Sequence, residues 1–563
     1  MLPAPTLVLG KLAALALVVG PPMKGDIMQL NATRRSVVKA GAAATVALGI
    51  SGIMTSSEIA NAQEADSSQE ECVDVVVVGA GAAGLAAAAT ASEAGATVVV
   101  LESGSFAGGA TLYSGGHMLW LDEEFNATQE RNDADLEKYL DLDPETLGEA
   151  AGDLRVLQGQ VQDYLADSTR AGKFDSIERV MVDHYLKGAG TDCDGNPVHL
   201  DYAIIRAAAE TNMEVLAWLQ SGGMEIQDTP YGMHANSPVN RGPSIIDALL
   251  NLAESAGAQV RYETKATGLV VDDGAVVGVR YVGKDGQAGT IGAGRVVLAS
   301  GGYAANAPLA ALYQNVGAGL SQNCGTTNPA TNRGEGMAMA QRGGAAVRDL
   351  QFLTTVLEGY HNGCSLAEVG KIMGTQQLVV NAECGRFADE ATAFKSTMNN
   401  QALNDQTDGL SFLVGDAKML AALNEAKEGF AEDLAERDWF CVADTLEEAA
   451  ASLGLDADAL AATVDQFNSY VDAGEDPDFG RTDFAGKVEE APFVVAKMEM
   501  HYHLTFGGLI VDEKARVLDI NGQPIAGLYA AGDVTSGYEG KVHQSGDCLS
   551  IVVCGGIAAG TME

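Results

Sequence analysis

Residues 536–550, SGYEGKVHQSGDCLS, gather side chains that can bind or transfer protons into one glycine-rich stretch near the end of the chain. Tyr538 could donate a hydrogen bond to a carbonyl oxygen or protonate a carbon, and His543 could bind a carbonyl or carboxylate or supply a proton. Both residue types also have structural uses, Tyr538 in packing and His543 in bonding to backbone. Glu539 is a weaker candidate, because glutamate is more often a surface charge. The stretch indicates a polar site whose ligand other segments must identify.

The elements that would position such a site begin with CVDVVVVGAGAAGLAAAATASEAGATVVVLES (72–103), which predicts strand, glycine turn, helix and strand. Gly79 allows the tight turn, Gly81 lets the backbone approach a pyrophosphate, and Gly84 lets helix and strand pack closely. Glu102 ends the second strand, where an acid bonds a ribose hydroxyl. The pattern predicts a dinucleotide at the start of the helix, whose free N–H groups bind phosphate.

Further segments follow in a characteristic order: SGSFAGGATLYSGG (103–116), NLAESAGAQVRYETKATGLVVDDGAVVGVRYV (251–282), RVVLASGGYAAN (295–306), NRGEGMAMAQRGGAAV (332–347) and GGLIVDEKARVLDINGQPIAGLYAAGDV (507–534). Together they resemble the flavoprotein family of fumarate reductases, succinate dehydrogenases and 3-ketosteroid Δ1-dehydrogenases. The resemblance spans roughly residues 72–563 and implies that the dinucleotide is FAD.

The resemblance also implies a fold. We expect an α/β protein with a Rossmann-like FAD-binding domain of the glutathione-reductase type, formed by residues 70–350 and 505–563. An inserted α+β cap domain is expected at residues 351–504. A cap that closes over the flavin would exclude water, as reductive chemistry requires.

In the family, particular residues contact the flavin. Asp533 would hold the ribityl chain, and the backbone at Cys548 and Leu549, at a helix start, would contact the isoalloxazine. Asp547 and Cys548 stand where the family has Asn-Ala. Other contacts are expected from Gly79, Gly81, Ala83, Gly84, Glu102, Gly108, Gly109, Thr111, Gly115, Gly116, Ala266, Ala299 and Gly301. Relatives with covalent flavin carry a histidine in the second glycine segment, but residues 110–113 contain none, so we expect non-covalent FAD. No metal site is expected.

The family's fumarate reductases bind their substrate with arginines and histidines, because a dicarboxylate is costly to bury without cationic partners. Here most of those positions have lost their charge. Aligned on short anchors, they fall on Leu353, Gly370, Met373, Phe394, Leu504 and His543. A dianion would bind poorly in such a pocket, so fumarate is not the expected substrate.

Four residues are the candidates for catalysis. In 3-ketosteroid dehydrogenases a substrate-facing tyrosine stands where His543 falls, so the resemblance places this position beside the substrate in both branches of the family. Tyr538 lies in the same stretch. MHYHLTF (500–506) alternates as a strand, so Tyr502 would share a face with Leu504, and His503 remains beside it. Lys395 is a weaker candidate.

We therefore expect a FAD-dependent reductase of an activated C=C bond in a bulky enone or enoate. Two alternatives stay open. One is a 3-ketosteroid-type dehydrogenase, because flavin potential and donor supply set the direction; the other is a non-catalytic flavin electron carrier. The sequence has no CxxCH haem motif among its 8 cysteines. Electrons are expected from a separate donor such as a membrane-attached cytochrome, in anaerobic respiration.

Charge and the N-terminal region indicate where the protein works. A net charge of −42 argues against nucleic acid as a partner. TRRSVVKAGAAATVALGISGIM (33–54) resembles a twin-arginine signal with cleavage after Ala62, so residues 1–62 are the expected signal region. Met23 or Met28 is the expected initiator, which would leave residues 1–27 untranslated. We expect export to the periplasm or the outer face of the cytoplasmic membrane, without an integral membrane segment after processing.

Overall fold

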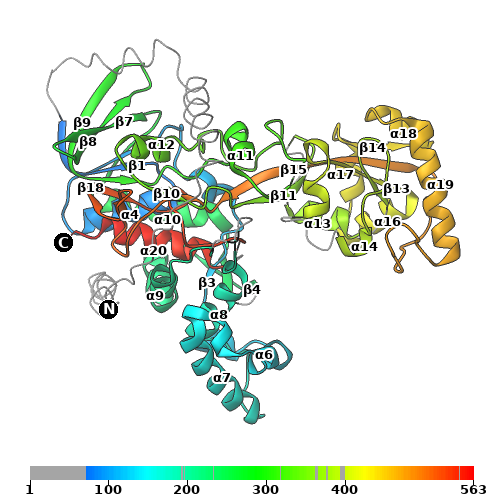
Figure 1. Ribbon diagram of the computed structural model, residues 1–563, viewed down its shortest axis with the longest axis horizontal. Helices are drawn as coiled ribbons and strands as arrows, with labels where there is room; N and C mark the ends of the chain where they lie inside the picture. Colours follow the sequence, from blue (N-terminus) through cyan, green and yellow to red (C-terminus); the bar gives the residue numbers. More distant parts are fainter. Residues whose placement is uncertain are drawn as a thin grey trace. The chain divides into compact units, whose positions relative to one another are not determined.

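The computed structural model describes residues 71–191, 195, 197–231, 234–317, 319–361, 366–375, 378–393, 400–543 and 546–562 (Figure 1). The chain divides into two compact units. The first comprises the chain up to Gly302, Pro329–Leu350 and Phe506–Glu563, and the second comprises Tyr303–Asn328 and Gln351–Thr505. Tyr303–Asn328, which we expected in the first domain, thus groups with the second unit. The expected signal region, residues 1–62, lies outside the described residues.

The first unit is built on a sheet in the order β17-β18-β9-β1-β2-β6, eight-stranded over the described residues once the β7–β8 hairpin is included. The strands are β1 (Glu71–Val78), β2 (Val98–Leu101), β6 (Gln259–Arg261), β7 (Lys265–Asp272), β8 (Ala275–Val282), β9 (Ala288–Leu298), β17 (Arg516–Leu518) and β18 (Pro524–Ala530). β1 pairs in parallel with both β2 and β9. Its residues Val75–Val78 are buried, as a strand covered on both faces requires. The predicted Rossmann-like architecture is confirmed.

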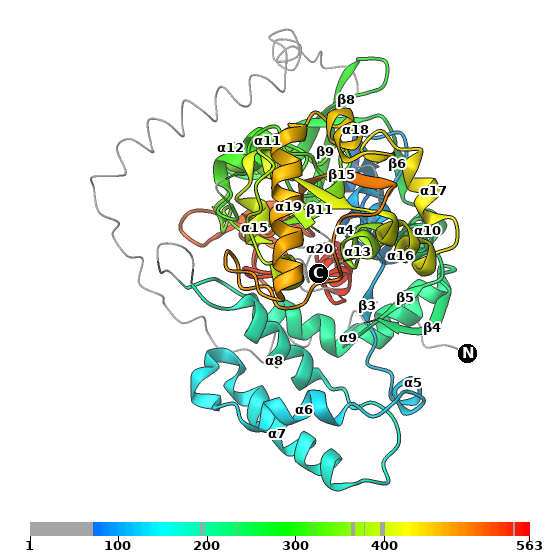
Figure 2. The ribbon, with the colours of Figure 1, turned by 90° about the vertical axis from the view of Figure 1, so that its right-hand side faces the viewer.

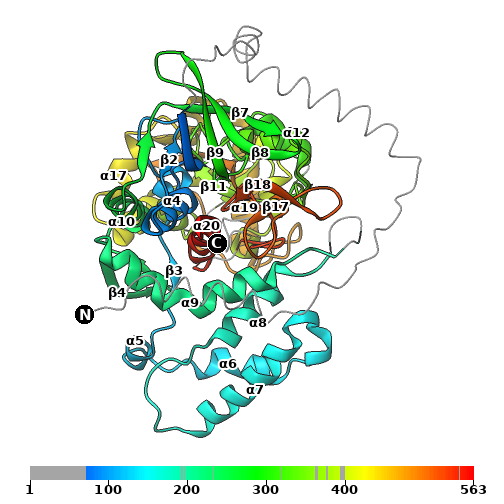
Figure 3. The same cartoon turned by 90° about the vertical axis from the view of Figure 1, so that its left-hand side faces the viewer.

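Helices α4 (Ala82–Glu93), α10 (Arg241–Ser255) and α20 (Cys548–Gly560) lie along one side of this sheet (Figure 3). α4 and α20 are rich in alanine and glycine because their backbones nearly touch. A Cβ on Gly556 would lie 2.3 Å from the carbonyl oxygen of Ala83. The other elements of this unit are β3 (Met118–Leu119), α9 (Tyr202–Ser221), β4 (Ile226–Tyr231), β5 (Ala235–Pro238), α12 (Glu335–Arg342), β10 (Val347–Arg348) and β16 (Gly508–Leu509).

A helical lobe extends the first unit. It contains α5 (Glu123–Ala127), α6 (Asp133–Leu140), α7 (Ala151–Ala166) and α8 (Ile177–Gly188). The lobe has its own apolar cluster, which includes Leu136, Leu154, Leu157 and Val161. It also buries charge: Arg179 is fully buried, and the Tyr139 hydroxyl donates to Asp183 Oδ1 at 2.6 Å. The lobe therefore has an apolar core and a buried polar network of its own.

The second unit is α+β, as predicted. Its sheet has the order β11-β15-β13-β12, with β14 also paired to β15. The strands are β11 (Leu353–Gly359), β12 (Leu378–Val380), β13 (Leu410–Gly415), β14 (Phe440–Ala443) and β15 (Phe493–Thr505). The helices include α11 (Ala307–Tyr313), α13 (Leu366–Met373), α14 (Glu390–Ala393), α15 (Gln401–Asn404), α16 (Ala417–Ala426), α17 (Phe430–Ala435), α18 (Leu446–Ser452) and α19 (Ala457–Ala473). Figure 2 views this unit with α19 in the foreground.

No helix among the described residues is both long enough and apolar enough to cross a membrane.

Candidate flavin and substrate site

The glycine turn between β1 and α4 has the geometry expected of a dinucleotide site. Gly79 adopts φ +104°, and a Cβ there would lie 2.4 Å from the carbonyl oxygen of Ala299. A Cβ on Gly84 would lie 2.0 Å from the carbonyl oxygen of Gly79, so this glycine lets helix and strand pack. A Cβ on Gly81 would meet no atom nearer than 3.9 Å, which leaves room for a ligand against the backbone. No side chain caps the start of α4, so its first N–H groups suit a phosphate.

This turn opens onto a hollow of about 870 Å³, part of it open to solvent. Most residues expected to contact the flavin line it: Gly79, Gly81, Ala83, Glu102, Gly109, Thr111, Ala266, Ala299, Gly301 and Asp533. The others do not line it: Gly84, Gly108, Gly115, Gly116, Cys548 and Leu549. Their proposed flavin contacts stay predictions.

Glu102 lies at the end of β2, where the sequence placed it. Its carboxylate accepts hydrogen bonds from the backbone N–H of Ala80 at 2.8 Å and of Gly104 at 2.6 Å. These bonds join the glycine turn to the segment after β2. The carboxylate thereby forms a fixed acidic wall of the hollow, as a ribose-binding residue should.

Sequence reasoning did not single out several further lining residues. Lys265 and Glu335 form an ion pair at 2.9 Å across the hollow's wall, and Asn332 lies beside Gly301. The buried Ser300 hydroxyl also faces the hollow and has no hydrogen-bond partner among the described residues. A buried hydroxyl normally has a partner, so Ser300 fits a ligand with polar groups such as FAD. The quoted segments 251–282, 295–306 and 332–347 contained the signal for these residues.

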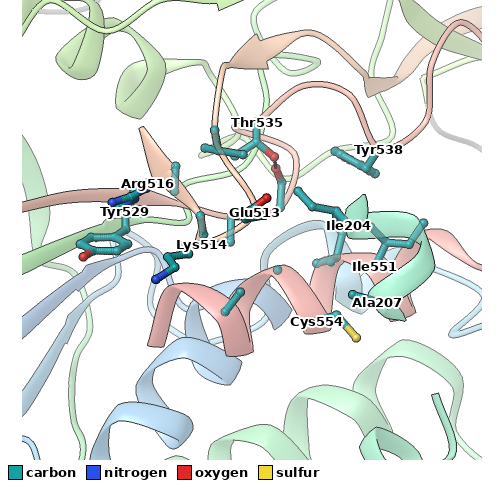
Figure 4. Close-up of a pocket in the computed structure, with 18 of the residues that line it drawn as sticks. Ile204, Ala207, Glu513, Lys514, Arg516, Tyr529, Thr535, Tyr538, Ile551 and Cys554 are labelled. Carbon is teal, nitrogen blue, oxygen red and sulfur yellow. Dashed lines mark hydrogen bonds between the residues drawn. The ribbon is translucent and has the colours of Figure 1, made fainter. Parts of the chain in front are cut away.

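A second, larger hollow of about 1240 Å³ lies between α20, the start of α9 and the β17–β18 hairpin (Figure 4). Ile204, Ala207 and Ile551 give it apolar walls. It lacks the glycine turn and the acidic residue of the first hollow, so size alone does not identify the dinucleotide site. The two hollows share Gly532 as part of their walls.

The stretch that begins at residue 536 lines the second hollow with Ser536 and Tyr538, and its described residues reach the first hollow only through a hydrogen bond. The Tyr538 hydroxyl donates to Asp533 Oδ1 at 2.7 Å, and Asp533 lines the hollow. Burial, with Asp533 adjacent, raises the pKa of Tyr538 well above its ordinary value. Burial also raises the pKa of Asp533, while the Tyr538 bond opposes that rise. The phenol therefore keeps its proton and holds the flavin-side carboxyl; its role as a proton donor to substrate stays a prediction.

His543 has an acidic neighbour from its own loop. Its Nδ1 lies 3.6 Å from Glu539 Oε2, and the Glu539 side chain is fully buried. Burial alone would lower the pKa of His543, but Glu539, Asp547 and Asp533 together raise it above its ordinary value. Burial, with Glu539 nearby, raises the pKa of the Cys548 thiol well above its ordinary range, so Cys548 is a protonated neighbour and not a nucleophile. The arrangement suits a histidine that holds a proton.

Another histidine near this loop was not foreseen. His117 follows the second glycine pair, and its Nδ1 lies 2.5 Å from the hydroxyl of Ser237. Burial, Arg241 and His543 lower the pKa of His117 to about 4, so it is neutral at physiological pH. Its place directly after Gly115 and Gly116 was the available sequence signal.

Tyr502 and His503 belong to the second unit. The Tyr502 side chain is buried, and its hydroxyl donates to the carbonyl oxygen of Ser321 at 3.3 Å; His503 Nδ1 lies 2.5 Å from the hydroxyl of Thr327. The strand is present, but its pairing with β11 shifts register between Tyr502 and Leu504. A bulge of this kind interrupts strict alternation, so the shared face of these two side chains does not follow from spacing.

The positions that align with the family's cations are apolar where the second unit describes them. Leu353 is 1% exposed and Met373 is 7% exposed. Gly370 lies in α13, and Leu504 lies in β15. Phe394 and the weaker candidate Lys395 fall outside the described residues.

Comparison with known proteins identifies the family. The family model described as FAD binding domain matches residues 74–549. The chain is 32% identical over 508 residues to NADH:acrylate oxidoreductase of Vibrio harveyi, covering 87% of this chain and 50% of that protein. It is 29% identical over 490 residues to urocanate reductase of Eggerthella lenta, covering 84% and 72%. The chain thus spans about half the length of the first relative.

Among solved structures, the open conformation of a flavocytochrome c3 fumarate reductase aligns with a TM-score of 0.69 at 25% identity. The alignment covers 97% of this chain and 84% of that one. The glycine turn, the acidic wall at Glu102 and the family match agree on the cofactor, FAD. The chain belongs to the FAD-binding flavoprotein family of oxidoreductases that includes the fumarate reductases.

Proposed function

We propose that this protein is a FAD-dependent reductase of an activated C=C bond, in an enone or enoate other than fumarate. The observation that carries the proposal is the pair of half-buried His543 and fully buried Glu539. The resemblance places His543 where the family's fumarate reductases have an arginine. An imidazole paired with its own carboxylate has less positive charge to offer a dianion than an arginine has. The buried Leu353 and Met373 add no cation in the second unit.

The proposed chemistry divides between cofactor and chain. When bound and reduced by a separate donor, FAD would supply a hydride equivalent to one carbon of the double bond. His543 holds the proton for the other carbon, and its raised pKa favours the protonated imidazole. Glu539, 3.6 Å away, stabilises the protonated imidazole. Asp533, which accepts the Tyr538 hydrogen bond, lines the first hollow.

The names of the two relatives support this substrate class. Acrylate and urocanate are unsaturated monocarboxylates, and neither requires the paired cations that fumarate does. We therefore propose a neutral or singly charged substrate, with a bulky or apolar remainder. Because the chain spans about half of the acrylate reductase, direct use of NADH is not part of the proposal.

The decisive experiment is anaerobic. The flavin of the purified protein is reduced, candidate acceptors are added one at a time, and the return of the oxidised flavin absorbance is followed. Enones and monocarboxylic enoates should reoxidise the flavin much faster than fumarate does. Reoxidation by fumarate at a rate comparable to the best enone would overturn the substrate assignment. Reoxidation by no member of the panel would favour a flavin electron carrier.

His543→Gln should slow this reoxidation by about 10²–10⁴-fold, the usual contribution of a positioned acid. The loss should affect the rate constant with FAD still bound, as judged by the flavin spectrum. The wild-type rate should also fall as pH rises through the raised pKa of His543, and the variant should lack that step. Tyr502→Phe and His503→Gln test the second unit in the same assay. A His543→Gln rate within about threefold of wild type would remove His543 from the mechanism.

We also propose that the protein is exported and receives electrons from a separate membrane-attached cytochrome. The twin-arginine pattern in residues 33–54 and the family's respiratory members motivate this proposal. Cell fractionation of a tagged chain tests it, with Arg34→Lys/Arg35→Lys as the matched variant. A tagged chain that stays in the cytoplasm in both forms would contradict export.

A further inference from the structure

One side chain from the helical lobe reaches both ends of the loop that carries His543. His184 lies on α8, and its side chain is fully buried. Its Nε2 lies 2.8 Å from the carbonyl oxygen of Tyr538, and its Nδ1 lies 2.8 Å from Asp547 Oδ2. Tyr538 begins this loop and Asp547 ends it; the structure describes residues 538–543, 546 and 547 of the loop. A single imidazole therefore connects the two ends of this loop.

The two hydrogen-bond partners of His184 determine the protonation state of its imidazole ring. A carbonyl oxygen can only accept a hydrogen bond, and a carboxylate accepts as well. Both nitrogens of His184 must then donate, so the imidazole carries a positive charge that Asp547 neutralises. Burial alone would lower the pKa of His184, but Asp547 and Glu539 raise it. The contact is a buried ion pair with directional bonds, which holds its geometry more firmly than packing alone.

Asp547 confirms that this contact is specific. It lies directly before α20, where an aspartate normally caps the free N–H groups of its own helix. Here it makes no such cap. Its carboxylate turns instead to a histidine 363 positions earlier in the chain. The family pattern has asparagine at this place, so the charged pair is a feature of this chain.

The same helix holds the middle of the loop through its C-terminal end. The backbone N–H of Lys541 donates to the carbonyl oxygen of Gly188 at 3.1 Å. Gly540 adopts φ +72°, and a Cβ there would lie 2.3 Å from that same oxygen. α8 thus contacts the loop at its beginning, middle and end, and His184 is the side chain that makes two of these contacts.

We propose that His184 is a positioning residue that fixes the described parts of the substrate loop, residues 538–543 and 546–547, on α8, and thereby sets the placement of His543 and Glu539. It does not itself exchange protons with substrate, because both ring nitrogens are engaged and the side chain is buried. The fixing of the loop by His184 does not depend on the proposed function. Only the expected effect on catalysis rests on that function.

The test is hydrogen exchange of the FAD-bound protein, read by mass spectrometry on peptides that cover residues 536–550. His184→Leu removes both bonds, and His184→Gln retains one donor group. Exchange in these peptides should rise by at least about tenfold in His184→Leu and by less in His184→Gln, because the loop then opens locally. Peptides from β1 and α4 should be unchanged. If His184→Leu does not fold, His184→Gln carries the test alone.

Two matched variants separate the fixing of the loop from general loosening. Tyr139→Phe removes a buried bond to Asp183, the residue before His184, without touching the loop. His501→Leu removes a buried histidine–carboxylate pair in the second unit. Both should leave exchange of residues 536–550 within about twofold of wild type. Equal loop exchange in wild type, His184→Leu and His184→Gln would overturn the proposal, and so would a Tyr139→Phe effect as large as that of His184→Leu.

Kinetics add a second measurement. If the loop positions His543, His184→Gln should raise KM and lower kcat for the best acceptor, while the absorbance of the bound flavin stays as in wild type. Failure of every acceptor with wild-type protein would defeat the proposed function and leave the exchange result intact. Increased loop exchange with unchanged kinetics would show that the loop is fixed by His184 but does not place a catalytic group, which would overturn the second half of the proposal.

Discussion

Both units of this protein bury histidines against carboxylates, and the His184–Asp547 and His501–Glu499 pairs make different kinds of contact. In the first unit His184 bonds Asp547, 363 positions away in sequence, and also the carbonyl oxygen of Tyr538. In the second unit His501 Nε2 lies 2.5 Å from Glu499 Oε1, two positions away on β15. The remaining nitrogen of His501 has no hydrogen-bond partner among the described residues. One pair joins distant segments, and the other stays within one strand.

The electrostatic surroundings differ as well. His184 faces two acceptors, so its charge is required and is compensated by Asp547. Glu499 instead lies opposite Glu358 on the neighbouring strand, and burial with Glu368 and Glu499 nearby raises the pKa of Glu358 to about 8. The carboxylate of the first pair, Asp547, holds a loop, whereas the carboxylate of the second pair, Glu499, lies beside a second buried glutamate, Glu358, whose pKa it helps to raise. A buried charge pair is informative about function when it joins segments that are far apart in the sequence and that no shared helix or strand brings together.

The largest predicted difference comes from removing each carboxylate. Asp547→Leu should cost about 3–5 kcal/mol in the first unit, because it leaves a buried imidazolium without its counter-charge. Glu499→Leu should cost less, about 1–3 kcal/mol, since it also relieves the repulsion between Glu499 and Glu358. Asp547→Asn keeps an acceptor oxygen and should fall between these values. Denaturation midpoints of the variants measure these losses of stability. Flavin release follows unfolding of the first unit, and Trp439 fluorescence follows unfolding of the second unit. Equal costs would erase the distinction between the two pairs.

A smaller effect should appear in the pH dependence of the second unit. The folded-state pKa of Glu358 is raised to about 8 from an ordinary 4.5, so the folded state holds a proton that the unfolded state releases. Stability of this unit should fall as pH rises from 4.5 to 8, by at most about 1.4 kcal/mol per pH unit. Glu358→Gln, which stays neutral, should flatten that slope in thermal unfolding followed by Trp439. An unchanged slope would show that Glu358 is not the group responsible.

The smallest predicted effect concerns the flavin wall. Tyr538→Phe removes the hydrogen bond to Asp533 but keeps the ring, so it should cost about 0.5–1.5 kcal/mol. FAD should then dissociate modestly faster, which dilution with flavin fluorescence detects. The position of the loop should change little, because His184 binds the Tyr538 backbone and not its side chain. Increased loop exchange as large as in His184→Leu would show that the phenol, and not the imidazole, holds the loop.

The sequence was sufficient for the flavin-binding half of the fold. GAGAAG at 79–84 with Glu102 requires a strand, a turn and a helix in adjacent positions, because each glycine there is dictated by backbone geometry. Most of the expected contacts line one hollow, and the α+β character of the inserted unit is also confirmed. Ser300 and Asn332 were missed as individual residues because their role depends on where two distant strand–turn segments converge.

The candidate catalytic site was less accessible from the sequence. Spacing placed Tyr502 and Leu504 on one face, but a register shift in the β11–β15 pair lies between them. His543 could be named from a family position, whereas its partner Glu539 had been set aside as a surface charge. Pairing of charges depends on burial, and burial is not a local property of the chain.

By itself, the sequence determined that this chain binds FAD, because a close approach of backbone to a pyrophosphate allows few residue types and few spacings. Only the tertiary structure decided which histidines bond to carboxylates from distant parts of the chain. His184 lies in an ordinary amphipathic helix, and Asp547 could have been a simple helix cap. Their bond joins residues 363 positions apart, and no local periodicity or propensity encodes a contact of that range.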